Sequence, residues 1–114
     1  MWIRRKVQKG TKTGQRIGYP TLNFHVGHFG EHYSEGVYSC DIQIADKVYK
    51  GALYYGPRLS HKGKVLEVHV QKFDKKIYGQ FVQFRVLKKV RGTKKIHNLD
   101  ELKKQIKEDL KSLN

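Results

Sequence analysis

The sequence contains only one cysteine, few acidic residues and no long apolar run. A single thiol, Cys40, excludes an internal disulfide and a zinc site made of several cysteines, and its apolar surroundings are typical of a buried thiol. No stretch of about 18 apolar residues that could span a membrane occurs, and residues 1–6 lack the apolar segment of a signal peptide. We therefore expect a protein of the reducing cytoplasm.

Acidic residues are outnumbered by basic ones, because 10 Asp and Glu stand against 24 Lys and Arg, a net charge of +14 at pH 7. Such a protein attracts polyanions. The charge is typical of an RNA-binding module, but it would also help a site attract phosphorylated ligands, and it could serve solubility alone. Composition leaves these three explanations open.

Alternating apolar and polar residues predict β-strands through most of the chain. Residues 36–44 have their apolar side chains on one face, and a short polar turn connects them to a second apolar segment at 48–55. These two segments are predicted to form a hairpin. A second antiparallel pair is predicted over residues 64–73 and 77–90. The length of 114 residues fits one domain, residues 1–114, around one core.

The segment 64–73 has two different faces, because Leu66 and Val68 alternate with Glu67 and His69. In a strand, successive side chains point to opposite sides. The apolar side is expected to face the core, which turns Glu67 toward a ligand or toward solvent. For an isolated glutamate on a strand, a solvated or ion-paired surface position is the commoner interpretation.

Helical periodicity is confined to the end of the chain. Apolar residues recur there at spacings of three, four, four and three, at Leu99, Leu102, Ile106, Leu110 and Leu113. Asn98 and Glu101 form a capping pattern, so the helix is expected to start near residue 98 and to pack on the outside of the β structure. Short antiparallel strands leave exposed edges unless the sheet closes, so we predict a small closed barrel with one packed helix.

A glycine-rich basic segment precedes the first of these strands. Its glycines and cations alternate along residues 9–18, at Lys9, Gly10, Lys12, Gly14, Arg16 and Gly18. Glycines let backbone N–H groups wrap an anion and the cations add charge, so the segment is a candidate phosphate cradle. It is not a P-loop, because no Gly-Lys-Ser/Thr follows. On spacing alone, a flexible basic loop is the preferred interpretation.

Pro20-Thr21-Leu22-Asn23 follows the glycine-rich segment. In an extended chain, residues two apart project to the same side, so the hydroxyl of Thr21 and the amide oxygen of Asn23 can converge on one point. Mg²⁺ accepts such neutral oxygen ligands when phosphates and waters complete its octahedron. The alternative is an ordinary turn followed by the start of a strand.

Several segments together resemble the riboflavin kinase (flavokinase) family. The segment 18–23 resembles the family's Gly-Phe-Pro-Thr-Ala-Asn motif. Further matches follow in the same order: Gly-Val-Tyr at 36–38, Val-Leu-Glu-Val-His-Val at 65–70, Ile-Tyr-Gly at 77–79, Val-Arg at 90–91 and the closing helix at 99–109. The resemblance covers nearly the whole chain and implies a mainly β fold, a closed six-stranded antiparallel flavokinase-like barrel with a C-terminal α-helix.

The resemblance also implies an activity: phosphorylation of riboflavin by ATP with Mg²⁺, giving FMN and ADP. It makes Glu67 the catalytic base and Thr21 and Asn23 the contacts to Mg²⁺ and the ATP phosphates. The glycine-rich loop, through Gly10, Lys12, Gly14, Arg16 and Gly18, would cover the nucleotide. Val70, Lys72 and Tyr78 would lie by the adenine nucleotide, and Arg91, Lys94 and Ile96 on the flavin side.

The chain departs from the family at a few positions. Ile96 replaces a family aromatic, Thr13-Gly14-Gln15 replaces an Arg-Gly-Arg, and residues 55–59 replace a Gly-x-x-Pro-Thr-Phe segment. The adenylyltransferase domain that precedes this module in bifunctional FAD synthetases is not in the sequence, which leaves a stand-alone kinase or an excised domain. We expect a monomer unless the chain is fused to or paired with an adenylyltransferase.

Two other functions compete with the kinase. One is a basic nucleic-acid-binding barrel, and the other is a flavin-binding protein without turnover. A metal site at His25, His28 and His32 is not expected, because these residues lie in a loop without a fixed helical face. Neither a membrane nor a specific nucleic acid is expected as partner.

Overall fold

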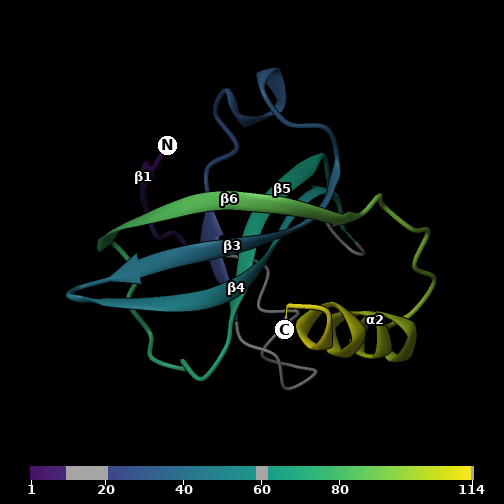
Figure 1. Cartoon of the computed structure of the whole chain (residues 1–114). Helices are drawn as coiled ribbons and strands as arrows, with labels where there is room; N and C mark the ends of the chain where they lie inside the picture. Colours follow the sequence, from purple (N-terminus) through teal and green to yellow (C-terminus); the bar gives the residue numbers. More distant parts are fainter. Residues whose placement is uncertain (10–20, 59–61, 114) are drawn as a thin grey trace.

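A computed structural model describes residues 1–9, 21–58 and 62–113 as a small β-barrel with one helix on its outside (Figure 1). The six strands form one antiparallel sheet in the order β1-β6-β3-β4-β5-β2. Their bounds are β1 Ile3–Lys6, β2 Leu22–Phe24, β3 Gly36–Ile44, β4 Lys47–Pro57, β5 Lys64–Val70 and β6 Phe81–Arg91. A short 3₁₀ turn, η1, covers Phe29–Glu31, and the helix α2 covers Leu99–Lys111.

The two ends of the sheet approach each other at β1 and β2. Gln8, just after β1, forms an isolated bridge with Asn23, and its N–H donates to the Asn23 carbonyl at 2.8 Å. Within the described residues, this bridge nearly closes the barrel. The prediction of a six-stranded antiparallel barrel with a C-terminal helix is thereby confirmed.

The core of the barrel is formed by the apolar side of each strand. In β3, Tyr38, Cys40, Ile42 and Ile44 are all buried, as their alternation predicted. Burial, with a smaller contribution from Asp41, raises the pKa of the Cys40 thiol to about 12, so this cysteine stays protonated. It is a buried, unreactive thiol, as the sequence suggested.

Two predicted strand limits were wrong. The segment predicted as 64–73 ends at Val70, and Lys72 has a φ of 59°, which no continuing strand allows. The segment predicted as 77–90 starts only at Phe81, because residues 77–80 form a turn in which the Gln80 N–H donates to the Ile77 carbonyl. Gly79 supplies the left-handed conformation of this turn, with a φ of 83°.

Helix α2 begins as predicted. The side chain of Asn98 accepts a hydrogen bond from the Glu101 N–H at 2.9 Å, whereas the Glu101 carboxylate accepts from the His97 N–H at 3.0 Å, one residue earlier than in a reciprocal capping box. The helix packs on the outside of the barrel (Figure 1). Its contact there is a second apolar cluster, formed by Val37, Ala52, Tyr54, Val65, Val90, Leu110 and Leu113.

Polar contacts also fix α2 to the barrel. Arg91 at the end of β6 donates to both carboxylate oxygens of Asp109 at 2.8 Å, and the Gln71 amide donates to the Leu110 carbonyl at 3.0 Å. Bidentate arginine pairs of this kind are among the stronger polar contacts. They fix the helix and the connection before it in one orientation.

No helix among the described residues is long and apolar enough to cross a membrane.

Candidate active site

Three side chains form a row across neighbouring strands on the outer face of the barrel. Asn23 of β2 lies opposite Glu67 of β5, and Glu67 lies opposite Tyr54 of β4. The chain neighbours of each of these residues belong to the barrel core, so the three side chains point away from it. Residues directly opposite in an antiparallel sheet have Cβ atoms about 5 Å apart, so this row is a compact cluster.

Thr21 belongs to the same cluster. The Asn23 side-chain amide donates to the Thr21 hydroxyl at 3.4 Å, so the two side chains share one face, as predicted after Pro20. A half-turn of the Asn23 amide would place its oxygen beside that hydroxyl. The two residues then offer two neutral oxygen ligands next to the Glu67 carboxylate, a donor set that fits Mg²⁺ completed by phosphates and waters.

Glu67 is buried and ion-paired. Only 7% of the residue is exposed, and its Oε1 accepts a hydrogen bond from Nε of Arg58. The Arg58 guanidinium lies over the Tyr54 ring, 3.8 Å from its centroid, and its Nη2 lies 3.3 Å from Nε2 of His69. A single arginine thus contacts three side chains of the outer face.

Burial keeps His69 neutral. It lowers the pKa of His69 to about 3, and the nearby charge of Arg58 acts in the same direction. Because Arg58 donates to Nε2, the ring proton belongs on Nδ1, which has no hydrogen-bond partner among the described residues. His69 therefore acts as an uncharged acceptor that orients Arg58.

The hydroxyl of Tyr54 is also fixed. It donates a hydrogen bond to the Pro57 carbonyl. Burial raises the pKa of Tyr54 above its usual value, although the charge of Arg58 opposes this shift. A protonated, hydrogen-bonded phenol does not compete with Glu67 as a proton acceptor, so Tyr54 serves as a platform for Arg58.

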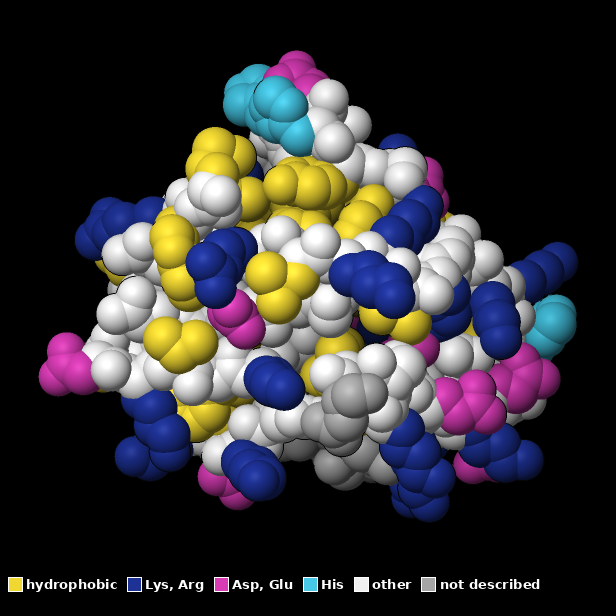
Figure 2. All heavy atoms as spheres, viewed as in Figure 1, with side chains coloured by type: hydrophobic (Ala, Val, Ile, Leu, Met, Phe, Trp, Pro, Cys, Tyr) yellow, Lys and Arg dark blue, Asp and Glu magenta, His cyan; other side chains and the backbone are white. Residues whose placement is uncertain are grey.

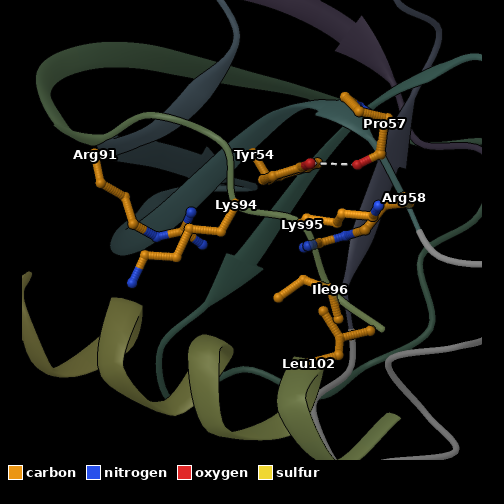
Figure 3. A pocket seen from close by; sticks show the side chains of 8 residues that line it. All are labelled: Tyr54, Pro57, Arg58, Arg91, Lys94, Lys95, Ile96 and Leu102. Atoms are coloured by element: carbon orange, nitrogen blue, oxygen red, sulfur yellow. Dashed lines mark hydrogen bonds between the residues drawn. The ribbon is translucent and has the colours of Figure 1, made fainter. Parts of the chain in front are cut away.

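A pocket of about 210 Å³ lies between the end of β4, the connection after β6 and the start of α2 (Figure 3). Its lining is Tyr54, Pro57, Arg58, Arg91, Lys94, Lys95, Ile96 and Leu102. The structure thus brings the three residues predicted for the flavin side, Arg91, Lys94 and Ile96, into one pocket next to Glu67. Their role toward a flavin stays a prediction.

Arg91 is heavily engaged within this pocket. Besides its two hydrogen bonds to Asp109, its Nη1 donates to the Gly92 carbonyl at 2.8 Å. Its side chain is 16% exposed and that of Asp109 is 8% exposed. Arg91 therefore shapes the pocket wall through α2, whereas Lys94 and Lys95 are exposed residues of the connection.

The residues predicted for the nucleotide are less closely grouped. Val70 lines a small hollow together with Thr21, Phe73 and Lys75. Lys72 is exposed beyond the end of β5, and Tyr78 is exposed with Nζ of Lys9 6.0 Å from its ring centroid. The predicted loop residues Gly10, Lys12, Gly14, Arg16 and Gly18 lie outside the described residues.

Several residues of the site were not predicted from the sequence: Tyr54, Pro57, Arg58, His69, Lys95 and Leu102. Tyr54 carried a signal, because it alternates with the buried Leu53 and Tyr55 and so belongs to the outer face. Arg58 carried no such signal, since it lies just beyond β4 and meets Glu67 only through the fold.

Among the described residues, no three His, Cys, Asp or Glu side chains are grouped to hold a metal, and this includes His25, His28 and His32.

The barrel has the riboflavin kinase fold. Riboflavin kinase from Trypanosoma brucei superposes with a TM-score of 0.66 at 22% identity, over 98% of this chain and 76% of that chain. The family model for flavokinase, described as riboflavin kinase, matches residues 1–114. The chain therefore belongs to the riboflavin kinase family.

Other similar proteins are longer. The bifunctional riboflavin kinase/FMN adenylyltransferase of Haemophilus influenzae is 33% identical in an alignment of 110 positions that covers 94% of this chain and 35% of that protein. A crystal structure titled macrolide-efflux protein from Streptococcus pneumoniae superposes with a TM-score of 0.81 at 28% identity, over 98% of this chain and 38% of that one. The chain thus spans little more than a third of these two proteins.

Proposed function

We propose that this chain transfers the γ-phosphoryl group of ATP to the 5′-hydroxyl of riboflavin, giving FMN and ADP. Membership of the riboflavin kinase family supports the substrate. The observation that carries the proposal is the pairing of Asn23 with Glu67 on adjacent strands, with Thr21 at hydrogen-bond distance from Asn23. A candidate base and two candidate metal ligands thereby meet on one face, next to a pocket.

The chemistry needs little else from the protein. The ribityl oxygen forms a bond to the γ-phosphorus, the bond from that phosphorus to the ADP oxygen breaks, and the hydroxyl proton passes to the Glu67 carboxylate. Mg²⁺, when bound, neutralises charge on the phosphates. Thr21 and Asn23 are the residues that would hold it. Lys94, Lys95 and Ile96 would position the flavin from the connection before α2.

The bifunctional relative suggests a partner. Its name joins a riboflavin kinase to an FMN adenylyltransferase. We propose that FMN made by this chain passes to such an adenylyltransferase, either on the same polypeptide or as a separate protein, and that the domain is otherwise monomeric. Size-exclusion chromatography of the purified chain tests the second part, since a stable dimer would contradict it.

Replacement of the candidate base tests the proposal. Glu67→Gln keeps the size of the side chain and its hydrogen-bonding ability but removes the proton acceptor. We expect FMN formation to fall by about 10²- to 10⁴-fold while binding of MgADP, measured by calorimetry, is retained. Glu108→Gln on the exposed side of α2 is the matched control and should have normal turnover. Near-normal turnover in Glu67→Gln would exclude Glu67 as the base.

A further inference from the structure

Arg58 occupies a position that the proposed reaction does not explain. Its side chain is 11% exposed and lies between Tyr54, Glu67 and His69, yet it also lines the pocket predicted for the flavin (Figure 3). Its Nε donates to Oε1 of Glu67, one of the two carboxylate oxygens that could accept a proton. In this arrangement Arg58 blocks one oxygen of the candidate base.

The pocket is more positive than a neutral flavin requires. Arg58, Arg91, Lys94 and Lys95 all line it. Asp109 compensates Arg91 and Glu67 compensates Arg58, while the described residues place no carboxylate on Lys94 or Lys95. Riboflavin brings no charge to such a pocket, whereas a phosphoryl group does. The charge pattern therefore favours an occupant that carries phosphate.

We propose that Arg58 exchanges its ionic partner during the reaction, from Glu67 to the phosphate group that becomes the phosphate of FMN. This inference rests on the proposed function. The exchange would free Oε1 of Glu67 when phosphate arrives and would place a forked cation on that phosphate. The Tyr54 ring supports the guanidinium from one side, so a rotation of the guanidinium can change its partner without losing the stacking contact.

The surrounding contacts suit such an exchange. His69 is neutral and accepts a hydrogen bond from Nη2 of Arg58, so it orients the guanidinium without placing a charge beside it. Glu67 and phosphate are then the two anions that compete for Arg58. Removing the Glu67 carboxylate should make Arg58 more available to phosphate and so strengthen phosphate binding. Without Arg58, removing that carboxylate should give no such increase.

Flavin binding measures this competition without turnover. Dissociation constants for riboflavin and FMN are obtained from flavin fluorescence quenching, with each ligand alone. Arg58→Ala is expected to raise the dissociation constant of FMN by about 10- to 100-fold, the range for a lost charged hydrogen bond, and that of riboflavin by less than about threefold. Glu67→Gln is expected to lower the dissociation constant of FMN and to leave that of riboflavin unchanged. When Arg58 is already alanine, adding Glu67→Gln should no longer lower the dissociation constant of FMN.

The double variant separates partner exchange from simple repulsion. If Glu67 only repels phosphate, Glu67→Gln tightens FMN equally with and without Arg58, and the proposal is wrong. Equal weakening of riboflavin and FMN by Arg58→Ala would make Arg58 a structural residue and also contradict it. The double variant removes both charges of the pair and is expected to fold even if Arg58→Ala alone does not. Arg58→Lys, which keeps the charge without the fork, should fall between wild type and Arg58→Ala for FMN.

Arg85 provides a matched control. It pairs with Asp41 at 2.7 Å and its guanidinium lies over the ring of Trp2, so it has a carboxylate and an aromatic partner as Arg58 does, but on the more exposed β6 and outside the pocket lining. Arg85→Ala should leave both flavin constants unchanged. The proposed function can fail separately: a chain that binds FMN through Arg58 but forms none from riboflavin and MgATP would refute turnover, while the exchange of Arg58 from Glu67 to a bound phosphate would stand.

Discussion

At the scale of single residues, His69 shows what burial does to a titratable group beside the candidate base. Its side chain is 5% exposed, and its pKa is lowered from an ordinary 6.5 to about 3, first by burial and then by Arg58. The unfolded chain binds a proton on this histidine between these two values, whereas the folded protein does not. His69 therefore contributes stability that is fully present above pH 6.5 and is lost as the pH falls toward 3.

This linkage gives a prediction for acid stability. The free energy of unfolding should fall by up to about 1.4 kcal/mol per pH unit through His69 alone below pH 6.5. His69→Gln, which keeps an acceptor for Arg58, should therefore lose less stability between pH 7 and 4.5 than wild type does, measured by urea unfolding. His32→Gln, at an exposed histidine, should behave like wild type. Equal losses in wild type and His69→Gln would contradict this account.

A second residue-scale prediction concerns Thr21 and Asn23. If these side chains hold Mg²⁺, alanine at either position removes an oxygen ligand and should raise the Mg²⁺ concentration for half-maximal rate, by roughly 10-fold or more. The measurement is a titration of the initial rate with Mg²⁺ at fixed ATP. Gln83→Ala, on the exposed side of β6, is the control. A change in riboflavin KM with an unaltered Mg²⁺ titration would place the metal elsewhere.

The sequence predicted the direction of Glu67 but not its surroundings. Alternation with Leu66 and Val68 was enough to turn Glu67 to the outer face, because the period of a strand is two. The ion pair to Arg58 was not predictable, since it depends on where the chain goes after β4. The shared face of Thr21 and Asn23 followed from their spacing alone.

At the scale of elements, α2 and the connection before it determine the shape of the pocket. Leu102 and Ile106 are buried, and Arg91 and Asp109 join the end of β6 to the helix. Breaking a buried ion pair at one partner leaves the other charge uncompensated, which typically costs about 3 to 5 kcal/mol. The position of the 91–96 connection therefore depends on Arg91.

This dependence predicts the effect of Arg91→Ala. We expect the riboflavin KM to rise while the ATP KM stays nearly unchanged, because Arg91 belongs to the pocket and not to the Thr21 side. Asp109→Asn should raise the riboflavin KM as well if Arg91 acts by fixing α2. An increase with Arg91→Ala alone would indicate direct contact with the flavin. A raised ATP KM with an unchanged riboflavin KM would show that the flavin and nucleotide ends of the site are reversed.

Local elements were easier to predict than distant pairings. The hairpin of β3 and β4 and the cap at Asn98 depend on neighbouring residues, and both were found from the sequence. The end of β5 and the start of β6 were misplaced because Lys72 and Gly79 adopt left-handed conformations that periodicity does not show. The pairing of β1 with β6 joins residues far apart in sequence, and it was not predicted.

At the scale of the whole molecule, the charge of +14 does not select a nucleic-acid function. On the face shown in Figure 2, Lys and Arg side chains are spread over strands and helix and are interspersed with acidic ones, without a continuous stripe. Polyanion binding along a groove requires such a stripe. On this face the basic residues are scattered, and the four basic residues of the pocket are a local group that would attract a phosphorylated ligand.

The central claim is that this chain by itself transfers phosphate to riboflavin. The most direct measurement is incubation of the purified chain with riboflavin, Mg²⁺ and ATP labelled at the γ-phosphate, followed by separation of flavins and nucleotides. We predict one labelled phosphate in FMN for each ADP formed, and labelling about 10²- to 10⁴-fold slower with Glu67→Gln. Binding of both riboflavin and MgATP without labelled FMN would contradict the account.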